Sequence, residues 1–327
     1  MATKGATTIN CAVEDANPYN IETQRNKKMS GDLSSPTAAA GSSNRSQKTK
    51  EEIENPYESS EQLNMYLSLH YPSPASSQTS ALGVEAIMPH AGAPNHALHF
   101  AQRTARLLCS LCDPNQMGKA LDIGCAVGGA AFDLATKFNE VQAFDYSESF
   151  IKAAKIMQKD GKMSYSIRIE GDISETTTAI LDDSITPEVR NRCHFFQGDA
   201  CKLKDLVHAR NIGKFDAVLM SNLLCRLPDP IACIDGLRHI VNRGGVVLLL
   251  TPYTWLEEYT PRCNWIGGHR CPNSGDVIRS RDVLKQLMED CGFERIHVEQ
   301  VPLLIREHMR KYQYIISEAT GWRKIRD

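Results

Sequence analysis

From residue 120 onward, short apolar segments alternate with longer amphipathic segments, and this alternation restricts the fold more than any other feature of the chain. The apolar segments are rich in Val, Leu, Ile and Phe, as buried strands are. We expect strands at 121–125, 141–147, 164–173, 193–200, 215–222, 246–253, 293–305 and 312–320, of which 164–173 has an exposed pattern. We expect helices at 128–138, 147–161, 229–245 and 280–293. Such an order predicts an α/β fold with a doubly wound, mostly parallel sheet.

The segment LDIGCAVGG lies where the first strand turns into the first helix. Glycine at Gly124 and Gly128 lets the backbone turn tightly, and it lets a ligand approach the chain. Asp122 precedes this turn, and Cys125 lies inside it. A dinucleotide site would favour a further glycine where this chain has Ala126. Tight strand-to-helix turns use glycine without any ligand, so this pattern alone leaves both explanations open.

Polar residues follow the next strands at the places where each strand ends. Asp145 ends the second strand, where a carboxylate can accept both hydroxyls of a ribose. Asp199 ends the third strand and can accept from an adenine amino group, and Asn222 ends the fourth. Tyr146 and Ala200 stand directly beside these residues. Because the carboxyl ends of parallel strands meet at one edge, the set predicts a nucleotide-like ligand there.

These motifs resemble those of the class I S-adenosylmethionine (SAM)-dependent methyltransferases over about residues 100–305. The matching segments are LDIGCAVGG, the acid after strand two, GDA after strand three, and FDAVLMSNLL followed by GGVVLLL. The resemblance implies a seven-stranded, Rossmann-like sheet with a final reversed hairpin, SAM as cofactor and S-adenosylhomocysteine (SAH) as product. It implies cofactor contacts from Asp122, Gly124, Cys125, Ala126, Gly128, Asp145, Tyr146, Asp199, Ala200 and Asn222. Arg103 is our candidate for the cofactor carboxylate, with a helix-surface arginine as the alternative.

The first part of the chain has a different composition. Residues 1–52 are rich in Ser, Thr, Asn, Lys and Ala and hold few large apolar side chains, so we predict a disordered tail. We expect residues 53–327 to form the methyltransferase domain. Within it, 53–115 would be an N-terminal helical lid with helices at 59–70 and 96–112, and 116–327 would be the Rossmann-like core. Ser59 and Gln62 have the spacing of a capping box.

Charge and cysteine content argue against several classes of protein. The chain has 37 Lys and Arg against 39 Asp and Glu, a formal net charge of −2, which argues against a nucleic-acid partner. No apolar run approaches the ~20 residues of a membrane span, and the N-terminus lacks the pattern of a signal peptide. The 11 scattered cysteines are typical of free thiols in a reducing cytoplasm. Cys109 and Cys112 form an isolated C-x-x-C in an apolar helical stretch, so we expect core packing and no metal.

The segment PYTWLEEYTPRCNWIGG, residues 252–268, is unusually aromatic and follows the most apolar strand. A loop at this place overhangs the position of the reacting methyl group. Aromatic faces can enclose a cation or a flat ring, the two acids can hold an ammonium group, and the arginine can hold a carboxylate. The candidate substrate contacts here are Tyr253, Trp255, Glu257, Glu258, Arg262 and Trp265. A well-packed surface loop is the alternative.

A closer resemblance is to the methyltransferases of ovothiol biosynthesis, from about residue 55 to the end. It is carried by NPYESSEQLNMYLSLHY, LDIGCAVGGAAFDLA, QGDACKL, NLLCRLPDP, TPYTWLEEYTPRCNWIGG and IREHMRKYQYIISEATGWRK. The resemblance implies N-methylation of the imidazole of 5-thiohistidine to give ovothiol A. In many organisms this enzyme is the C-terminal domain of an iron-dependent sulfoxide synthase, whose histidine-rich motif this sequence lacks. We therefore expect a separate methyltransferase in functional association with such a synthase, with a small molecule as its substrate.

For the reaction, we expect a neutral imidazole nitrogen to attack the sulfonium methyl in line, which depends mainly on position. The candidate catalytic residues are Asn222, Tyr253 and His308. Beyond the aromatic loop, the candidate substrate contacts are Tyr66, His70 and Arg306. The alternatives are a methyltransferase acting on RNA or protein, and a non-catalytic SAM-binding partner of the synthase.

Overall fold

The structure, a computed structural model, describes residues 55–72, 95–308 and 310–326. The chain divides into two units, and all described residues belong to the second, Ser42–Asp327. The tail predicted at 1–52 lies outside the described residues. Within the described ranges, no helix is both long and apolar enough to cross a membrane.

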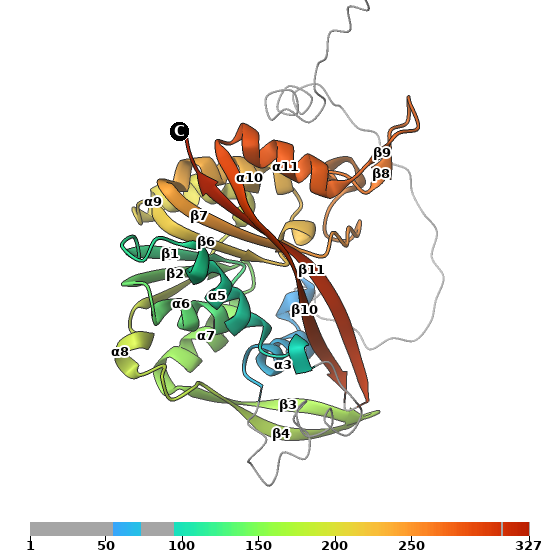
Figure 1. Cartoon of the computed structure of the whole chain (residues 1–327). Coiled ribbons are helices and arrows are strands. Elements are labelled where there is room, and N and C mark those ends of the chain that lie inside the picture. The colour runs from blue at the N-terminus through green and yellow to red at the C-terminus, as the bar shows by residue number, and fades with distance from the viewer. Residues whose placement is uncertain (1–54, 73–94, 309, 327) are drawn as a thin grey trace, which may run out of the picture. The chain divides into compact units, whose positions relative to one another are not determined.

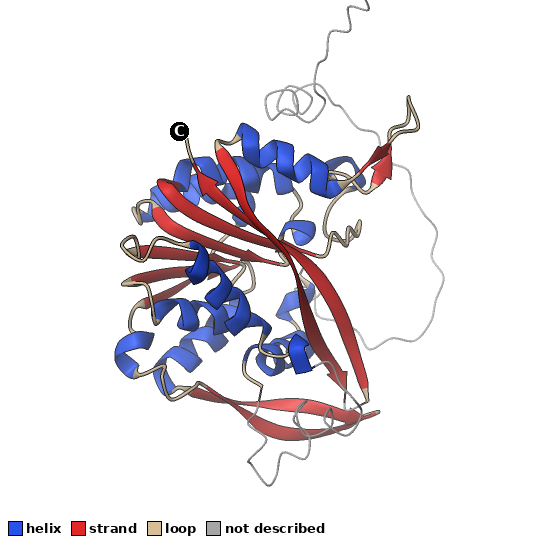
Figure 2. Ribbon diagram, viewed as in Figure 1, coloured by secondary structure: helices blue, strands red, loops and turns tan. Residues whose placement is uncertain are grey.

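A seven-stranded sheet with the order β10-β11-β7-β6-β1-β2-β5 forms the centre of this unit (Figure 2). Neighbours from β7 to β5 pair in parallel, whereas β11 is antiparallel to both β7 and β10. The strands are β1 (Lys119–Ile123), β2 (Glu140–Asp145), β5 (Cys193–Gln197), β6 (Phe215–Ser221), β7 (Val241–Thr251), β10 (Phe293–His308) and β11 (Lys311–Lys324). The predicted doubly wound, mostly parallel sheet with a reversed terminal hairpin is confirmed.

Helices cover both faces of the sheet, with α5, α6 and α7 on one face and α9, α10 and α11 on the other (Figure 1). Their bounds are α5 (Phe100–Leu111), α6 (Gly129–Ala135), α7 (Glu148–Asp160), α9 (Leu203–Arg210), α10 (Pro230–Ile240) and α11 (Ser280–Asp290). Because both faces are covered, the central strands are apolar throughout, and residues 246–250 of β7 are fully buried.

Two predicted helices end differently in the structure. The helix expected at 229–245 stops at Ile240, because Val241 already pairs with Phe215 at the start of β7. The helix expected at 96–112 is divided: η3 (Asn95–Ala97) is separated from α5 by His99, whose φ of 55° lies in the left-handed region. A helix cannot continue through that backbone conformation.

Several elements lie outside the main sheet. The strand expected at 164–173 is β3 (Lys162–Glu170), which pairs only with β4 (Ile173–Ile180) in a projecting hairpin. We did not predict β4, because its residues are mostly polar and exposed. The other elements are α8 (Pro187–Arg190), β8 (His269–Arg270), β9 (Val277–Ile278), η4 (Ala200–Lys202), η5 (Leu224–Arg226) and η6 (Arg262–Asn264).

The N-terminal segment forms η1 (Pro56–Glu58) and α3 (Ser60–His70). Local capping defines both: Asn55 Oδ1 accepts from the Tyr57 amide at 3.1 Å, and Ser59 Oγ accepts from the Gln62 amide at 3.3 Å. Helix α3 contacts β10, β3 and α5, so it lies between the long β10–β11 hairpin and the β3–β4 hairpin (Figure 1).

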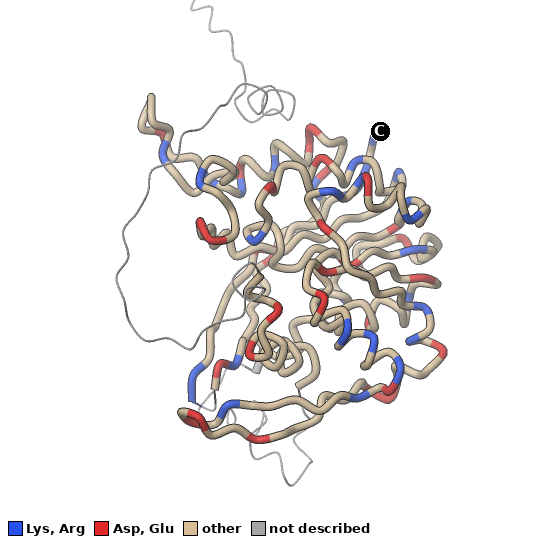
Figure 3. Tube along the Cα trace, turned by 180° about the vertical axis from the view of Figure 1, so that it is seen from behind, with Lys and Arg blue, Asp and Glu red and all other residues tan. Residues whose placement is uncertain are grey.

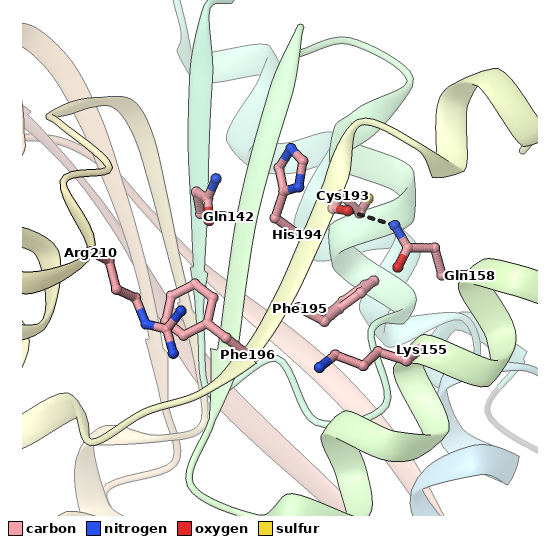
Figure 4. A pocket seen from close by; sticks show the side chains of 8 residues that line it. All are labelled: Gln142, Lys155, Gln158, Cys193, His194, Phe195, Phe196 and Arg210. Carbon is pink, nitrogen blue, oxygen red and sulfur yellow. Dashed lines mark hydrogen bonds between the residues drawn. The ribbon is translucent and has the colours of Figure 1, made fainter.

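Strand β5 is the outer strand of the sheet, and a shallow cavity of about 450 Å³ lies along its free edge (Figure 4). Arg210 lies 4.0 Å above the ring of Phe196, and Lys155 projects from α7 on the other side. Gln158 Nε2 donates to the Cys193 carbonyl. Helices and charged side chains that cover an edge strand oppose its pairing with another chain, so we interpret this cavity as part of the protected edge and not as a ligand site.

Candidate active site

The loop between β1 and α6 has the backbone geometry that its glycines predict. Gly124 has φ 72°, and a Cβ there would lie 3.0 Å from the Leu223 side chain. Gly128 has φ 91° and lies against Phe195. Ala126 also adopts a positive φ, 47°, a region that side chains disfavour. The loop is therefore held in a defined shape at the end of β1, where a ligand can approach its backbone.

Asp145 at the end of β2 holds that loop in place. Its Oδ2 accepts from the Ala126 amide at 2.9 Å, and its Oδ1 accepts from the Ser147 amide at 2.9 Å. Burial raises the pKa of Asp145 to about 6, although three backbone amides act to lower it. Each carboxylate oxygen retains a second lone pair, so the group can accept ligand hydroxyls without releasing the loop.

Asp122 is the most deeply buried acid of the site, with 2% of its surface exposed. Its Oδ2 has no hydrogen-bond partner among the described residues. Burial and, second, the charge of Asp145 raise the pKa of Asp122 to about 7. A buried acceptor without a donor is costly, so this position suits a ligand that brings a donor or a cation. The ammonium group of SAM is such a donor, so the residues present fit this cofactor.

Asn222 follows β6 with an unusual backbone, φ 54°, and its amide donates to the Leu250 carbonyl at 2.9 Å. Its Oδ1 accepts from Ser317 Oγ of β11 at 2.7 Å. Ser317 thereby fixes the orientation of the amide and leaves Nδ2 as the group that could donate to a ligand. Sequence reasoning missed Ser317, because its placement depends on the pairing of β11 with β7.

The adenine-side candidates lie at the ends of β2 and β5. Asp199 caps η4, accepting from the Cys201 amide at 2.9 Å, and its Oδ2 lies 3.5 Å from Lys202 Nζ. Ala200 is buried, whereas Tyr146 is 63% exposed. Asp199 therefore has a structural role as a cap besides any contact with a ligand.

An aromatic cluster joins the N-terminal segment to this edge of the sheet. We call Tyr57, Tyr66, Phe150 and Tyr259 the tyrosine cluster. The ring of Tyr57 lies 6.0 Å from that of Tyr66 and 6.0 Å from that of Tyr259, and the ring of Tyr66 lies 4.9 Å from that of Phe150. The charge of Asp145 acts on the pKa of Tyr66, which burial raises to about 12. The tyrosine cluster therefore lies beside the predicted ribose site.

Polar contacts fasten η1 and α3 to the core. Glu58 accepts from the amides of Glu148 and Ser149, at 2.8 and 3.1 Å, and so caps α7 from outside. Tyr71 Oη donates to the Val127 carbonyl at 2.6 Å. The predicted lid thus contacts the glycine loop and the helix after Asp145.

His70 completes this attachment, and its role differs from our expectation. Its Nδ1 accepts from the Gly129 amide at 3.1 Å, so the ring is neutral with its proton on Nε2. Burial lowers the pKa of His70 to about 4. We expected His70 to hydrogen-bond the substrate ring or accept its proton. The structure contradicts the proton-acceptor role, because Nδ1 is occupied and Nε2 is a donor.

Most of the aromatic-loop candidates hold the loop itself. Trp255 Nε1 donates to Ser280 Oγ at 2.8 Å, and its ring stacks on Trp265 at 6.3 Å. Trp265 in turn donates to the Thr260 carbonyl and lies 4.2 Å below the Arg262 guanidinium. Of the candidate substrate contacts in this loop, Glu257, Glu258 and Arg262 are exposed.

Tyr253 is also turned away from the expected position. Its Oη donates to Glu318 Oε1 at 2.9 Å, and Glu318 Oε2 lies 3.1 Å from Arg281. Residues Ser317 and Glu318 are consecutive in β11, so their side chains point to opposite faces. The Tyr253 hydroxyl therefore lies on the face opposite Ser317 and Asn222, and its proton is already donated.

The hairpin candidates lie far along β10 and β11. In the β10–β11 register, Val301 lies directly across from Ser317, so these two side chains point to the same face of the hairpin. Arg306 is five residues beyond Val301, and because side chains alternate along a strand, it points to the other face. His308 is seven residues beyond Val301, about 23 Å along a strand, and its Nδ1 accepts from the Arg310 amide. The structure does not bring Arg306 or His308 to Asn222.

Arg103 has two backbone partners, the carbonyls of Leu98 and Pro302, and so ties α5 to β10. Within the described ranges, no group of three His, Cys, Asp or Glu residues could hold a metal ion. Lys and Arg are interspersed with Asp and Glu along the described chain (Figure 3).

Besides Ser317, sequence reasoning missed the residues that join the lid to the core: Tyr57, Glu58, Tyr259 and Arg226. The available signal was their position in segments that resemble the ovothiol methyltransferases, namely NPYESSEQLNMYLSLHY, NLLCRLPDP and TPYTWLEEYTPRCNWIGG.

Residues 97–298 match the profile of a family described as "Methyltransferase domain". The chain belongs to this family. Its sheet order, glycine loop and strand-end acids are those of a class I SAM-dependent methyltransferase, and the protein is such an enzyme. No curated protein matches the sequence.

Several solved structures are similar to the chain. Magnesium protoporphyrin IX methyltransferase from Synechocystis PCC 6803 is 15% identical, covering 85% of this chain and 99% of that one, with a TM-score of 0.45. The N-methyltransferase NodS from Bradyrhizobium japonicum WM9 is 13% identical, covering 69% and 87%, with a TM-score of 0.41. A methyltransferase from Methanosarcina mazei is 19% identical, covering 65% and 95%, with a TM-score of 0.40.

Proposed function

We propose that this methyltransferase N-methylates the imidazole ring of 5-thiohistidine and so produces ovothiol A. The observation that carries the proposal is where the resembling segments lie. The lid, the segment after β6 and the aromatic loop are separate in sequence, yet they meet in the tyrosine cluster and Arg226 beside Asp145. A site bounded by a fastened lid favours a small acceptor over a polymer.

SAM, when bound, supplies a methyl group made electrophilic by the adjacent sulfonium. The chain's own residues then have three tasks: to hold the acceptor nitrogen in line, to exclude water, and to keep the acceptor sulfur away from the methyl group. The Nδ2 donor of Asn222, fixed by Ser317, is the group we assign to orientation of the acceptor. The tyrosine cluster covers the site and excludes water.

No strong base is needed for this reaction. The attacking nitrogen uses its lone pair, the methyl–sulfur bond breaks with its electrons on sulfur, and the ring proton leaves afterwards. His70 cannot take this proton, because burial lowers its pKa to about 4 and its Nδ1 accepts from Gly129. We therefore assign the proton released in the reaction to solvent.

The test is a mass-spectrometric assay with deuterium-labelled SAM against 5-thiohistidine, histidine and an RNA pool. We expect label on 5-thiohistidine, on a ring nitrogen by NMR, and little on histidine. Label on RNA or on sulfur would contradict the proposal. Binding of SAM without transfer to any of these acceptors would instead support a non-catalytic partner of the synthase.

A further inference from the structure

Arg226 lies where three segments of the site meet. It ends η5, four residues after Asn222, and its Nη1 donates to the carbonyl of Thr254 in the aromatic loop at 2.9 Å. Its Cζ lies 4.7 Å from the centre of the Tyr259 ring. The Tyr259 ring in turn lies 6.0 Å from the ring of Tyr57 in the lid, whose phenol is within electrostatic reach of the guanidinium. A single guanidinium therefore connects β6, the aromatic loop and the lid.

This guanidinium has no carboxylate within ion-pair distance among the described residues. Three arginines of the described chain have such a carboxylate partner: Arg168 with Glu61, Arg238 with Asp235 and Arg281 with Glu318. The neighbours of Arg226 are instead phenols, backbone carbonyls and the sulfur of Cys225, none of which is a carboxylate. A half-buried charge without a counter-ion is costly, so an anion that arrives with a ligand would relieve that cost.

The position of Arg226 matches that of the acceptor. Arg226 lies over the Tyr259 ring, which contacts the ring of Tyr57. The Tyr57 carbonyl accepts from Ser147 Oγ at 3.1 Å, and the Ser147 amide donates to Asp145. The guanidinium and the predicted ribose acid therefore flank the same tyrosine cluster. Asn222, the residue we assign to the acceptor nitrogen, starts the same short segment of chain. An acceptor held by both residues would present its ring to Asn222 and its anionic end to Arg226.

The other arginines considered for this role are engaged elsewhere. Arg103 uses Nε and Nη2 for backbone carbonyls, whereas the two backbone bonds of Arg226 both come from Nη1. Arg262 is exposed above Trp265, and Arg306 lies on the far face of the hairpin. Arg226 is the described candidate that combines burial, a shared site with Asp145 and the geometry of a fork that binds carboxylates.

We propose that Arg226 binds the carboxylate of an α-amino acid in the active site, and that this carboxylate belongs to the methyl acceptor. The assignment rests on the proposed function, because it takes 5-thiohistidine as the acceptor. The methionine carboxylate of the cofactor is the other source of the same chemistry, and the two arms of the experiment separate them.

The first arm compares two acceptors, 5-thiohistidine and its decarboxylated analogue 5-thiohistamine. In wild type we expect kcat/KM to be about 10- to 100-fold higher for the carboxylated acceptor. Arg226→Met keeps an apolar stem but removes the charge. It should therefore lower kcat/KM for 5-thiohistidine and leave kcat/KM for 5-thiohistamine unchanged. Arg226→Lys, which keeps the charge without the fork, should restore part of the difference. The second arm measures SAM affinity by calorimetry, which we expect Arg226→Met to leave unchanged.

A matched control is Arg210→Met, which removes an arginine that also stacks on an aromatic ring but lies on the outer edge of the sheet (Figure 4). This variant should change neither the preference for the carboxylated acceptor nor the affinity for SAM. Thermal melting of each variant identifies any that fail to fold. If Arg226→Met is misfolded, the comparison of the two acceptors is made with Arg226→Lys instead.

Each remaining outcome overturns a specific statement. Equal losses for both acceptors with unchanged SAM affinity would mean that Arg226 only holds the segments together. A loss of SAM affinity would assign the carboxylate to the cofactor instead. If the wild-type enzyme methylates neither acceptor, the proposed function is wrong. In that case a carboxylate site at Arg226 is supported only if Arg226→Met weakens SAM binding, and without that effect it is wrong as well.

Discussion

The Asp145 carboxylate combines two tasks that the sequence alone would assign separately. It fixes the glycine loop through the Ala126 amide, and it stands where a ribose would bind. We predict that Asp145→Ala weakens SAM binding by about 1.5–3 kcal/mol, the range for hydrogen bonds to a charged group. Calorimetry on the folded variant measures this. Asp199→Ala should have a smaller effect, because one third of the Asp199 side chain is exposed and the residue caps η4. Unchanged affinity in Asp145→Ala would contradict the assignment.

The same residue predicts a pH dependence of cofactor binding. The pKa of Asp145 in the free protein is raised to about 6 by burial. Ribose hydroxyls donate to the ionised form, so they favour that form and lower its pKa in the complex. SAM affinity should therefore rise as the pH increases from 5 to about 7, and should level off above. Calorimetry across this range measures the slope.

Asp122 titrates close to the same range, with a pKa raised to about 7. Two variants separate the groups. Asp145→Asn should remove the part of the slope near pH 6, while Asp122→Asn should retain it. An unchanged slope in Asp145→Asn would show that another group controls the dependence.

At the scale of elements, the lid is held by Glu58 at the N-terminus of α7. A carboxylate that accepts from two free helix amides also interacts favourably with the helix dipole. We predict that Glu58→Ala speeds amide exchange in residues 60–70 and raises the Kd for SAM several-fold, because the lid opens more often. Glu61→Ala is the control, since Glu61 pairs with exposed Arg168 on β3. Equal exchange in both variants would refute the role of Glu58 as a fastening.

The structure changes the role that we expect for Tyr253, from a contact with the substrate to a contact within the protein. Its hydroxyl stabilises buried Glu318, so Tyr253→Phe should cost about 1 kcal/mol of stability. It should lower kcat/KM equally for thiolated and plain histidine, because the hydroxyl does not face Asn222. Chemical denaturation and kinetics with both acceptors measure these effects. A selective loss for the thiolated acceptor would return Tyr253 to the role of sulfur donor.

The sequence predicts the elements whose pattern is local. The glycine turn, the strand-end acids and the buried strand β7 carry signals within a few residues of one another. The positions of Arg306 and Ser317 could not be predicted in this way. They depend on the register of a long hairpin, where a shift of one residue moves every side chain to the other face.

At the scale of the whole molecule, the site is assembled from segments that no local pattern connects. Tyr57 and Tyr259 are 202 residues apart, yet their rings are 6.0 Å apart. Tyr57 precedes a predicted helix and Tyr259 lies in the unusually aromatic loop, but neither pattern predicts that the two residues meet. Only the resemblance to one family marks both segments, and it does so without stating that they meet.

The same assembly predicts how much of the N-terminus the enzyme needs. The composition of residues 1–52 offers little apolar surface to bury, whereas the contacts that fasten the lid begin at Asn55 and Glu58. Deletion of residues 1–50 should therefore leave Tm and kcat/KM unchanged. Deletion of residues 1–58 removes Tyr57 and Glu58 and should weaken SAM binding at least several-fold. Melting curves and kinetics on both deletions make the comparison, and a loss of activity with the shorter deletion would show that the tail contributes to the site.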